Sequence, residues 1–196
     1  MNVFIYDNGY KLTSYVKALL AVNATPVLTK DLSKLKECDA LLLSGGGDIC
    51  PAFYGEALNP YGNYDYLTDI CELYLLKECI KTKKQVVGIC KGIQVINVFF
   101  NGTLHGVPNN VISNHYTFSK DVLHNITLKN GKTFTVNSMH KQRIKNLGND
   151  LQIEAVSDDG TIEAISHRRY KVFGVQFHPE RMDLDILKKF YSNFFS

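Results

Sequence analysis

The sequence has no strong charge of either sign and no long basic stretch. Its 22 Lys and Arg residues nearly balance 19 Asp and Glu residues, giving a formal net charge of +3. No run of Lys or Arg is longer than two residues. Surfaces that bind nucleic acid normally carry clustered Lys and Arg side chains. We therefore expect no nucleic-acid partner.

Long apolar segments are also absent. A membrane-spanning helix needs about 20 consecutive apolar residues, and no stretch of this sequence approaches that length. Residues 1–7 lack the basic and apolar regions of a signal peptide. These absences predict a cytoplasmic protein with no membrane association.

Cysteine is present, but without the spacing of a cross-linked or metal-binding protein. The five cysteines are Cys38, Cys50, Cys71, Cys79 and Cys90. Their number is odd, and the sequence has neither a Cys-x-x-Cys motif nor a Cys/His ligand pattern. We therefore predict no disulfide framework and no metal site. Reduced thiols are typical of the cytosol.

Apolar runs and helical patterns alternate through residue 100. Strands are predicted at residues 3–6, 25–28, 40–43 and 85–89, and helices at residues 65–81 and 93–100. This alternation predicts an α/β fold, a flavodoxin-like three-layer α/β/α arrangement with a mostly parallel central sheet. A chain of 196 residues is long enough for one full core, so residues 1–196 are expected to form a single domain.

The pattern changes after residue 110. Short alternating runs at residues 112–118, 122–128 and 133–136 predict a small antiparallel insert beside the main sheet. Asn130-Gly131 is a hairpin turn signal between the last two runs. A second hairpin is expected between residues 151–156 and 161–166. A strand at 172–177 and an amphipathic helix at 183–195 end the chain.

The stretch Gly88-Ile89-Cys90-Lys91-Gly92 has the layout of a nucleophile elbow. It follows an apolar run and leads at once into an amphipathic segment, and its glycines allow a sharp turn between strand and helix. The N-terminus of the following helix favours a thiolate at Cys90. Cys90 is therefore the candidate nucleophile. The alternative is an ordinary buried thiol, because free Cys often behaves as a small apolar residue.

A second motif, His178-Pro179-Glu180, follows a late strand. His178 could act as the proton shuttle for Cys90, and Glu180 could hold the imidazole in the useful tautomer. The alternative is a polar turn after a strand, because motif matches are hypotheses until structural context supports them.

Glycines also follow the predicted strand at residues 40–43, in Ser44-Gly45-Gly46-Gly47-Asp48. Glycine lets a substrate carbonyl approach the backbone closely, so this loop could face a developing oxyanion. The N–H of Lys91, directly after the nucleophile, would be one donor in elbow geometry. A phosphate-binding loop is the alternative, but the Gly-Lys-Ser/Thr of such a loop is missing.

Together these motifs resemble the class I glutamine amidotransferases. More narrowly, the stretches 43–56 and 136–142, together with Gly102-Thr103-Leu104, are similar to the γ-glutamyl-γ-aminobutyrate hydrolase branch, the C26-type peptidases. The resemblance extends from about residue 40 to residue 182. Cys50, Thr68 and Cys71 depart from the residues common in that branch, whereas Asp69 and Glu72 match it. The departures lie near the expected substrate loop and make the leaving group uncertain.

The resemblance implies further site residues. It selects Gly46 as the second oxyanion donor, and Ser138, Met139 and His140 as contacts for the α-amino and α-carboxylate groups of a γ-glutamyl substrate. Met139 would act through its backbone. Gln94 lies one helical turn after Cys90, so its side chain can reach the glutamyl chain.

The other histidines show no such pattern. His115 is a candidate pocket residue, and His105, His124 and His167 are expected at the surface.

The leading hypothesis is a hydrolase that needs no cofactor and cleaves a γ-glutamyl amide through a γ-glutamyl thioester on Cys90, releasing glutamate and an amine. The leaving group could be γ-aminobutyrate, another polyamine-derived acid, or a larger nucleotide- or sugar-linked amide. A second hypothesis is a glutaminase subunit that delivers ammonia to a separate synthetase partner. A third is a binding protein with a vestigial site. The sequence leaves open whether the chain forms a homodimer.

Overall fold

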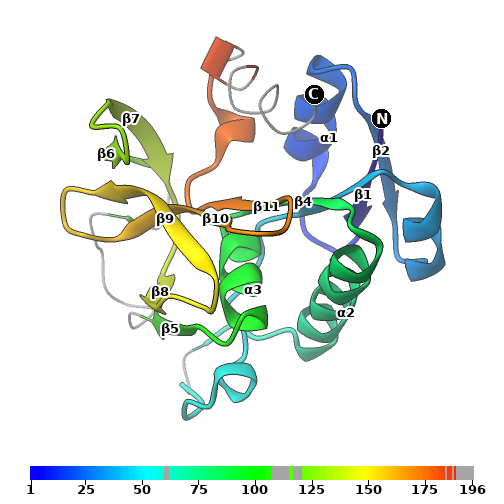
Figure 1. The fold of residues 1–196 in the computed structure, drawn as a ribbon, viewed down its shortest axis with the longest axis horizontal. Helices are drawn as coiled ribbons and strands as arrows, with labels where there is room; N and C mark the ends of the chain where they lie inside the picture. Colours follow the sequence, from blue (N-terminus) through cyan, green and yellow to red (C-terminus); the bar gives the residue numbers. More distant parts are fainter. Residues whose placement is uncertain (60–61, 107–114, 117–120, 184, 187, 189–196) are drawn as a thin grey trace.

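The fold is built on a nine-stranded mixed sheet with helices on both faces (Figure 1). The computed structural model describes residues 1–59, 62–106, 115–116, 121–183, 185–186 and 188. The strand order is β2-β1-β3-β4-β11-β10-β9-β6-β7. The predicted α/β class with helices on both faces of a central sheet is confirmed.

Five neighbouring strands are parallel and form the part of the sheet that carries Cys90. In spatial order they are β2 (Thr25–Thr29), β1 (Asn2–Tyr6), β3 (Ala40–Leu43), β4 (Gln85–Ile89) and β11 (Val172–Val175). All of β3 is buried, as is β4 beyond its first residue, as expected for apolar strands covered on both faces. Because β3, β4 and β11 run in one direction, the residues that follow them meet at one edge of the sheet.

Helices cover both faces of this parallel half. α1 (Thr13–Ala21) packs on one face, against Ile5 and Val87. α2 (Tyr66–Thr82) and α3 (Lys91–Phe99) pack on the other, against Phe4 and Val86. Neighbouring strand residues point to opposite faces, so each strand supplies both layers of the core. No helix of the described residues is long and apolar enough to cross a membrane.

The remaining four strands of the main sheet are antiparallel. They are β10 (Ile162–His167), β9 (Leu151–Ser157), β6 (Val122–Leu128) and β7 (Thr133–Ser138). Both predicted hairpins form, β6–β7 and β9–β10. The first hairpin does not stand beside the sheet as predicted: β6 pairs with β9 and extends the sheet itself. The predicted strand at 112–118 lies almost wholly outside the described residues.

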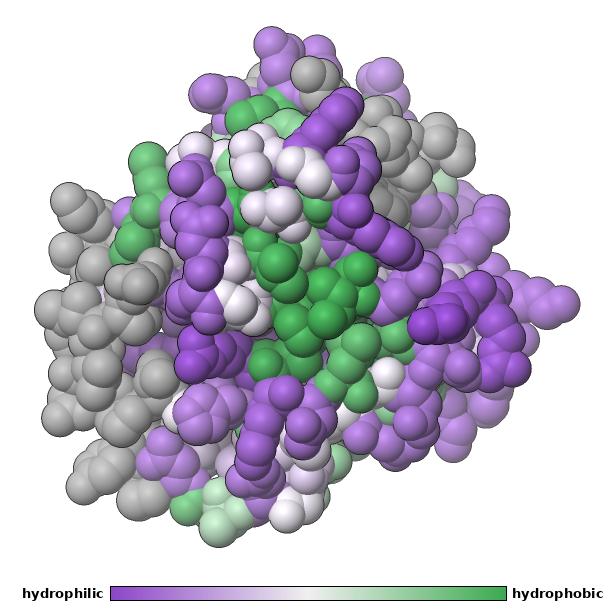
Figure 2. All heavy atoms as spheres, turned by 60° about the vertical axis from the view of Figure 1, so that its left-hand side comes forward, coloured by the Kyte–Doolittle hydropathy of each residue, from purple (hydrophilic) through white to green (hydrophobic). Residues whose placement is uncertain are grey.

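A separate two-stranded sheet, which the sequence did not predict, is formed by β5 (Thr103–Gly106) and β8 (Gln142–Asn146). Three short 3₁₀ helices complete the described elements, at Leu32–Glu37, Pro51–Tyr54 and Pro179–Arg181. Most of the predicted closing helix at 183–195 lies outside the described residues. Figure 2 shows apolar side chains, bordered by hydrophilic ones, on the side that includes β6, β7 and β9, where Leu123, Phe134 and Ile153 are exposed.

Candidate active site

Cys90 lies in a strained turn between β4 and α3. Its φ of 54° and ψ of −102° belong to a region that non-glycine residues rarely adopt, at a cost of about 1–3 kcal/mol. The flanking glycines are required: a Cβ at Gly88 would lie 2.5 Å from the Gly92 backbone, and a Cβ at Gly92 would lie 2.2 Å from the Leu43 carbonyl oxygen. The Cys90 N–H donates to the Val175 carbonyl at 2.8 Å, which fixes the turn against β11.

His178 and Glu180 follow β11 and lie beside this turn. The Nδ1 atom of His178 is 2.8 Å from Oε1 of Glu180, and both side chains are buried. A Cβ on Gly45 would lie 3.2 Å from His178 Cε1 and 3.6 Å from Cys90 Cβ, so both residues border the same glycine. The structure therefore brings together the three residues predicted as nucleophile, base and orienting carboxylate.

The electrostatics at His178 favour the imidazolium. Burial alone would lower the pKa of His178, but the charge and hydrogen bond of Cys90, followed by those of Glu180, raise this pKa to about 10. A His that keeps its proton beside a sulfur is the arrangement of a thiolate–imidazolium pair. Such a pair combines a ready nucleophile with a proton donor for the leaving amine.

Two further residues hold His178, and the sequence predicted neither role. The Asn137 side chain clamps the His178 backbone: its Oδ1 accepts the His178 N–H at 2.9 Å, and its Nδ2 donates to the His178 carbonyl at 3.0 Å. The Tyr15 hydroxyl lies 3.4 Å from His178 Nδ1 and accepts the Gly45 N–H at 2.9 Å. In the sequence Tyr15 lies on the apolar face of a helix, where nothing distinguishes it from a core residue.

The glycine loop reaches the elbow from β3. Tyr15 takes the Gly45 N–H, and the next N–H of the loop is that of Gly46, the donor predicted for the oxyanion. A Cβ at Gly46 would lie 3.0 Å from Cδ of Lys91, so the two predicted oxyanion donors come from segments in contact. The Lys91 N–H belongs to the first residue of α3, whose N–H groups have no partner within the helix.

The Lys91 side chain joins the start of α3 to α2. Its Nζ is 2.8 Å from Oδ1 of Asp69 and 2.7 Å from Oε2 of Glu72, and all three side chains are buried. Burial opposes the charge on Lys91, but the two carboxylates raise its pKa and keep it protonated. Asp69 also accepts the Cys50 N–H at 3.0 Å, which connects α2 to the segment after the glycine loop. The sequence predicted a role for the Lys91 backbone only.

A cavity of about 200 Å³ opens onto Cys90. Its walls include six of the predicted site residues, namely Gly46, Cys90, Lys91, Gln94, Met139 and His140. The rest of its described wall consists of Gly47, Asp48, Asn63, Tyr116, Lys141 and Gln142. Lys141 and Asp48 give the cavity charges of both signs, and burial raises the pKa of Asp48. The Lys141 Nζ lies 4.4 Å from the centre of the Tyr116 ring.

Gln94 is held by its amide nitrogen. Its Nε2 donates to the Gln142 carbonyl at 2.8 Å and to Oε1 of Gln176 at 3.2 Å. Gln142 is in turn fixed by two hydrogen bonds with the Ile49 backbone, at 2.8 and 3.0 Å. Since both amide hydrogens of Gln94 are used, its carbonyl oxygen is the group that it offers to a ligand.

Ser138 and His140, both predicted as side-chain contacts to the substrate, take different positions relative to the cavity. Ser138 is fully buried, its Oγ donates to the His115 carbonyl at 3.1 Å, and it is not part of the described cavity wall. His140 lines the cavity, but its Nδ1 lies 3.0 Å from the Gln142 carbonyl and its Nε2 lies 3.8 Å from Oε1 of Glu163. Both side chains are therefore engaged within the protein.

The other histidines require a correction. His105 is exposed as predicted, but His167 is buried and accepts the Arg169 N–H at 3.0 Å. The side chain of His124 is only 12% exposed and lies near buried Glu163. The surface prediction was wrong for both residues because each occupies an inward position on the antiparallel sheet or at its end. His115 is buried, as expected of a pocket residue, but it lines a different cavity, with His124.

The chain is similar to several known proteins. A family model described as Peptidase C26 matches residues 4–180. The chain is 32% identical over 158 residues to the glutamine amidotransferase-like protein YvdE of Lactococcus lactis, a match that covers 72% of this chain and 66% of that protein. It is 31% identical over 157 residues to a γ-glutamyl-CDP-amidate hydrolase of Campylobacter jejuni, covering 78% of this chain and 70% of that protein.

Among solved structures, a Thermoplasma acidophilum protein described as a component of GMP synthase matches with a TM-score of 0.66, covering 100% of this chain and 98% of the other. The sequences are 20% identical, so this likeness concerns the fold alone. The family model covers nearly all of the described chain, and both curated relatives support the same assignment. As its motifs predicted, the chain belongs to the Peptidase C26 family of glutamine amidotransferase-like hydrolases.

Proposed function

We propose that this protein hydrolyses a γ-glutamyl amide through a γ-glutamyl thioester on Cys90. The observation that carries the proposal is the placement of Cys90. Its strained turn at the start of α3 lies beside the buried His178–Glu180 pair, where Cys90 and Glu180 together raise the pKa of His178 to about 10. A buried structural thiol would need neither the strain nor the charged neighbour.

The reaction starts with attack of the Cys90 sulfur on the γ-carbonyl carbon. The carbonyl oxygen becomes an oxyanion, which the N–H groups of Gly46 and Lys91 stabilise. The His178 imidazolium then gives its proton to the amide nitrogen, the C–N bond breaks, and the amine leaves. Neutral His178 next takes a proton from water, whose oxygen attacks the thioester carbon, and the C–S bond breaks with Cys90 leaving as the thiolate. Glutamate and the starting form of the site result.

The cavity suits the head group of such a substrate. A γ-glutamyl group ends in an α-ammonium and an α-carboxylate, and Asp48 and Lys141 provide charges of opposite sign in the cavity wall. The Gln94 carbonyl oxygen and the Met139 backbone are the further contacts that we assign to the glutamyl chain. The name of the Campylobacter relative indicates that a γ-glutamyl group can be carried on a nucleotide-linked amide. We leave the amine of this protein's substrate unassigned.

Glutamate release by the purified full chain tests the proposal. We expect hydrolysis of γ-glutamyl amides faster than hydrolysis of glutamine, and loss of both activities in Cys90→Ala. Cys71→Ser, a change at a partly exposed thiol on α2, is the matched control and should keep the activity. Glutamine turnover only after addition of a synthetase would favour the alternative, a glutaminase that supplies ammonia to that partner. Activity that persists in Cys90→Ala would refute the site assignment.

A further inference from the structure

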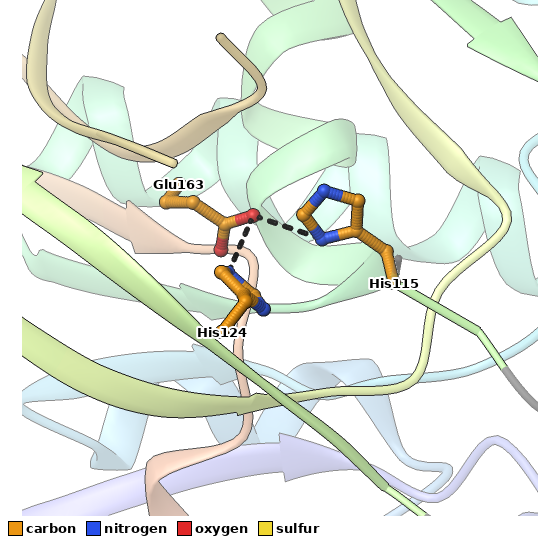
Figure 3. A group of neighbouring side chains, drawn as sticks. All are labelled: His115, His124 and Glu163. Atoms are coloured by element: carbon orange, nitrogen blue, oxygen red, sulfur yellow. Dashed lines mark ion pairs between the residues drawn. The ribbon is translucent and has the colours of Figure 1, made fainter. Parts of the chain in front are cut away.

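A second group of chemically active side chains lies behind the cavity wall, in the antiparallel half of the sheet. Figure 3 shows that His115 and His124 both point toward Glu163. Glu163 comes from β10, His124 from β6, and His115 from a segment before β6. Glu163 is completely buried, and neither of its carboxylate oxygens has a hydrogen-bond partner among the described residues. A buried carboxylate needs a partner that balances its charge.

The distances around Glu163 are those of ligands that share an ion. Its Oε1 lies 3.4 Å from His124 Nε2 and 3.5 Å from His115 Nδ1, and it lies 3.8 Å from the Nε2 of His140. Zinc binds imidazole nitrogen and carboxylate oxygen at about 2.0–2.2 Å, so two ligands of a tetrahedral site lie about 3.3–3.5 Å apart. Two of the three separations fall in this range.

A direct ion pair is the competing explanation, and the same chain provides a comparison. The His178–Glu180 pair is also buried, and its nitrogen and oxygen approach to 2.8 Å. The three imidazole nitrogens near Glu163 lie 3.4, 3.5 and 3.8 Å from its Oε1, at least 0.6 Å more than the distance in the His178–Glu180 pair. These distances exceed the usual range for a hydrogen bond. The candidate ligand atoms of His115, His124 and Glu163 all lie within 4.8 Å of one another, a spacing that ligands of a single ion can have.

In His140 and His115, the ring nitrogen that faces away from Glu163 has a hydrogen-bond partner of its own. Metal-binding histidines usually have such a partner. His140 Nδ1 lies 3.0 Å from the Gln142 carbonyl, so it carries the proton and Nε2 offers its lone pair toward Glu163. His115 Nε2 lies 3.0 Å from Oδ2 of Asp159, so Nδ1 is the nitrogen on the side of Glu163, where it also lies 3.3 Å from Oγ of Ser138. Carboxylate and carbonyl partners of this kind fix the tautomer and orientation of ligating histidines.

We propose that His115 Nδ1, His124 Nε2 and Glu163 Oε1, with His140 Nε2 as the fourth ligand, bind a divalent transition-metal ion. Three imidazoles and one carboxylate around a tetrahedral centre are a ligand set that suits zinc. The sequence shows no ligand spacing because the four residues come from separate segments. The ion takes no part in the bond cleavage at Cys90. It joins β6 and β10 to His140, and so holds one wall of the catalytic cavity in place.

Metal binding by the untagged full chain tests this site. We expect one zinc ion per chain by elemental analysis, about 2.0 Å zinc–nitrogen distances by X-ray absorption, and a rise in Tm when zinc is returned to the chelated protein. Glu163→Gln and His124→Asn should each weaken zinc binding at least tenfold in competition with a chromophoric chelator. His105→Asn, at an exposed histidine on β5, is the matched control and should bind zinc as the wild type does.

The wild-type protein decides the result even if the variants fail to fold. Less than one tenth of an equivalent of zinc on titration, with no change in Tm, would overturn the site. Equal zinc affinity in wild type and in folded Glu163→Gln would do the same. Cys90→Ala should keep its full zinc content, because Cys90 is not a ligand. Failure of the zinc site can therefore be told apart from failure of the proposed catalytic function.

Discussion

The buried cation beneath the elbow makes a quantitative prediction. Lys91→Met removes the positive charge between Asp69 and Glu72, whose side chains are only 1% and 2% exposed. Removal of one partner from a buried ion pair typically costs about 3–5 kcal/mol. At low pH the cost should be smaller, because one carboxyl can take up a proton. Protonating a carboxyl with the ordinary glutamate pKa of 4.5 at pH 7 costs about 3.4 kcal/mol. If Glu72 takes up a proton in the folded variant, this is the expected loss of stability at pH 7.

The dependence on pH follows from the same argument. In Lys91→Met the folded chain binds a proton that the unfolded chain does not bind above pH 4.5. The pKa of that carboxyl is raised by folding, so the stability that its proton contributes is lost as pH rises. Between about pH 5 and pH 7 the free energy of unfolding of Lys91→Met should fall by up to about 1.4 kcal/mol per pH unit more than that of the wild type, in which burial already raises the pKa of Glu72.

Urea unfolding followed by circular dichroism measures this difference. Lys34→Met is the control, because Lys34 pairs with Glu37 at 3.0 Å where both side chains are about half exposed. That change should leave the stability nearly unchanged, because a solvent-exposed ion pair contributes little. A loss below about 1 kcal/mol in Lys91→Met, or a loss that does not vary with pH, would refute the assignment of Lys91 as a charged group between two carboxylates.

Three predictions concern His178. Asn137→Ala should lower kcat about tenfold or more with little change in KM, because His178 loses its two backbone hydrogen bonds; an unchanged kcat would contradict this role. Glu180→Gln should lower kcat, and the fall of kcat/KM at high pH should begin at a lower pH, because Glu180 helps to raise the pKa of His178. An unchanged pH profile would contradict the pairing of these two residues. Gly45→Ala should also reduce kcat, because the new Cβ would lie 2.7 Å from the Tyr15 hydroxyl, and wild-type kinetics would show that this contact can relax.

The sequence allowed prediction of those features whose signals are local. The turn at Cys90 depends on Gly88 and Gly92, which stand two residues away on either side, and His178 is separated from Glu180 by one residue. The parallel half of the sheet was likewise marked by apolar runs such as Ala40–Leu43. In each case the residues that determine the geometry are neighbours in the chain, so a single pattern contains the information.

The features that escaped prediction depend on contacts between distant segments. Tyr15 lies 163 residues from the histidine that it approaches, and Asn137 lies 41 residues from it. The β6–β7 hairpin was predicted, but not its pairing with β9, because an alternating strand does not specify its partner. For His124 the alternation was visible, yet only the position of Glu163 shows that the side chain faces inward.

The segment from Asn137 to Gln142 shows why these distant contacts matter for function. Asn137 holds His178 on the catalytic side, and Ser138 holds the backbone at His115 on the other. His140 lines the cavity while its Nε2 faces Glu163, and Gln142 accepts from Gln94 and binds the loop at residue 49. One short segment therefore contacts the proton shuttle, the cavity wall and the His–Glu cluster. This segment therefore links the antiparallel half of the sheet, by direct contacts, to the residues around Cys90 in the parallel half.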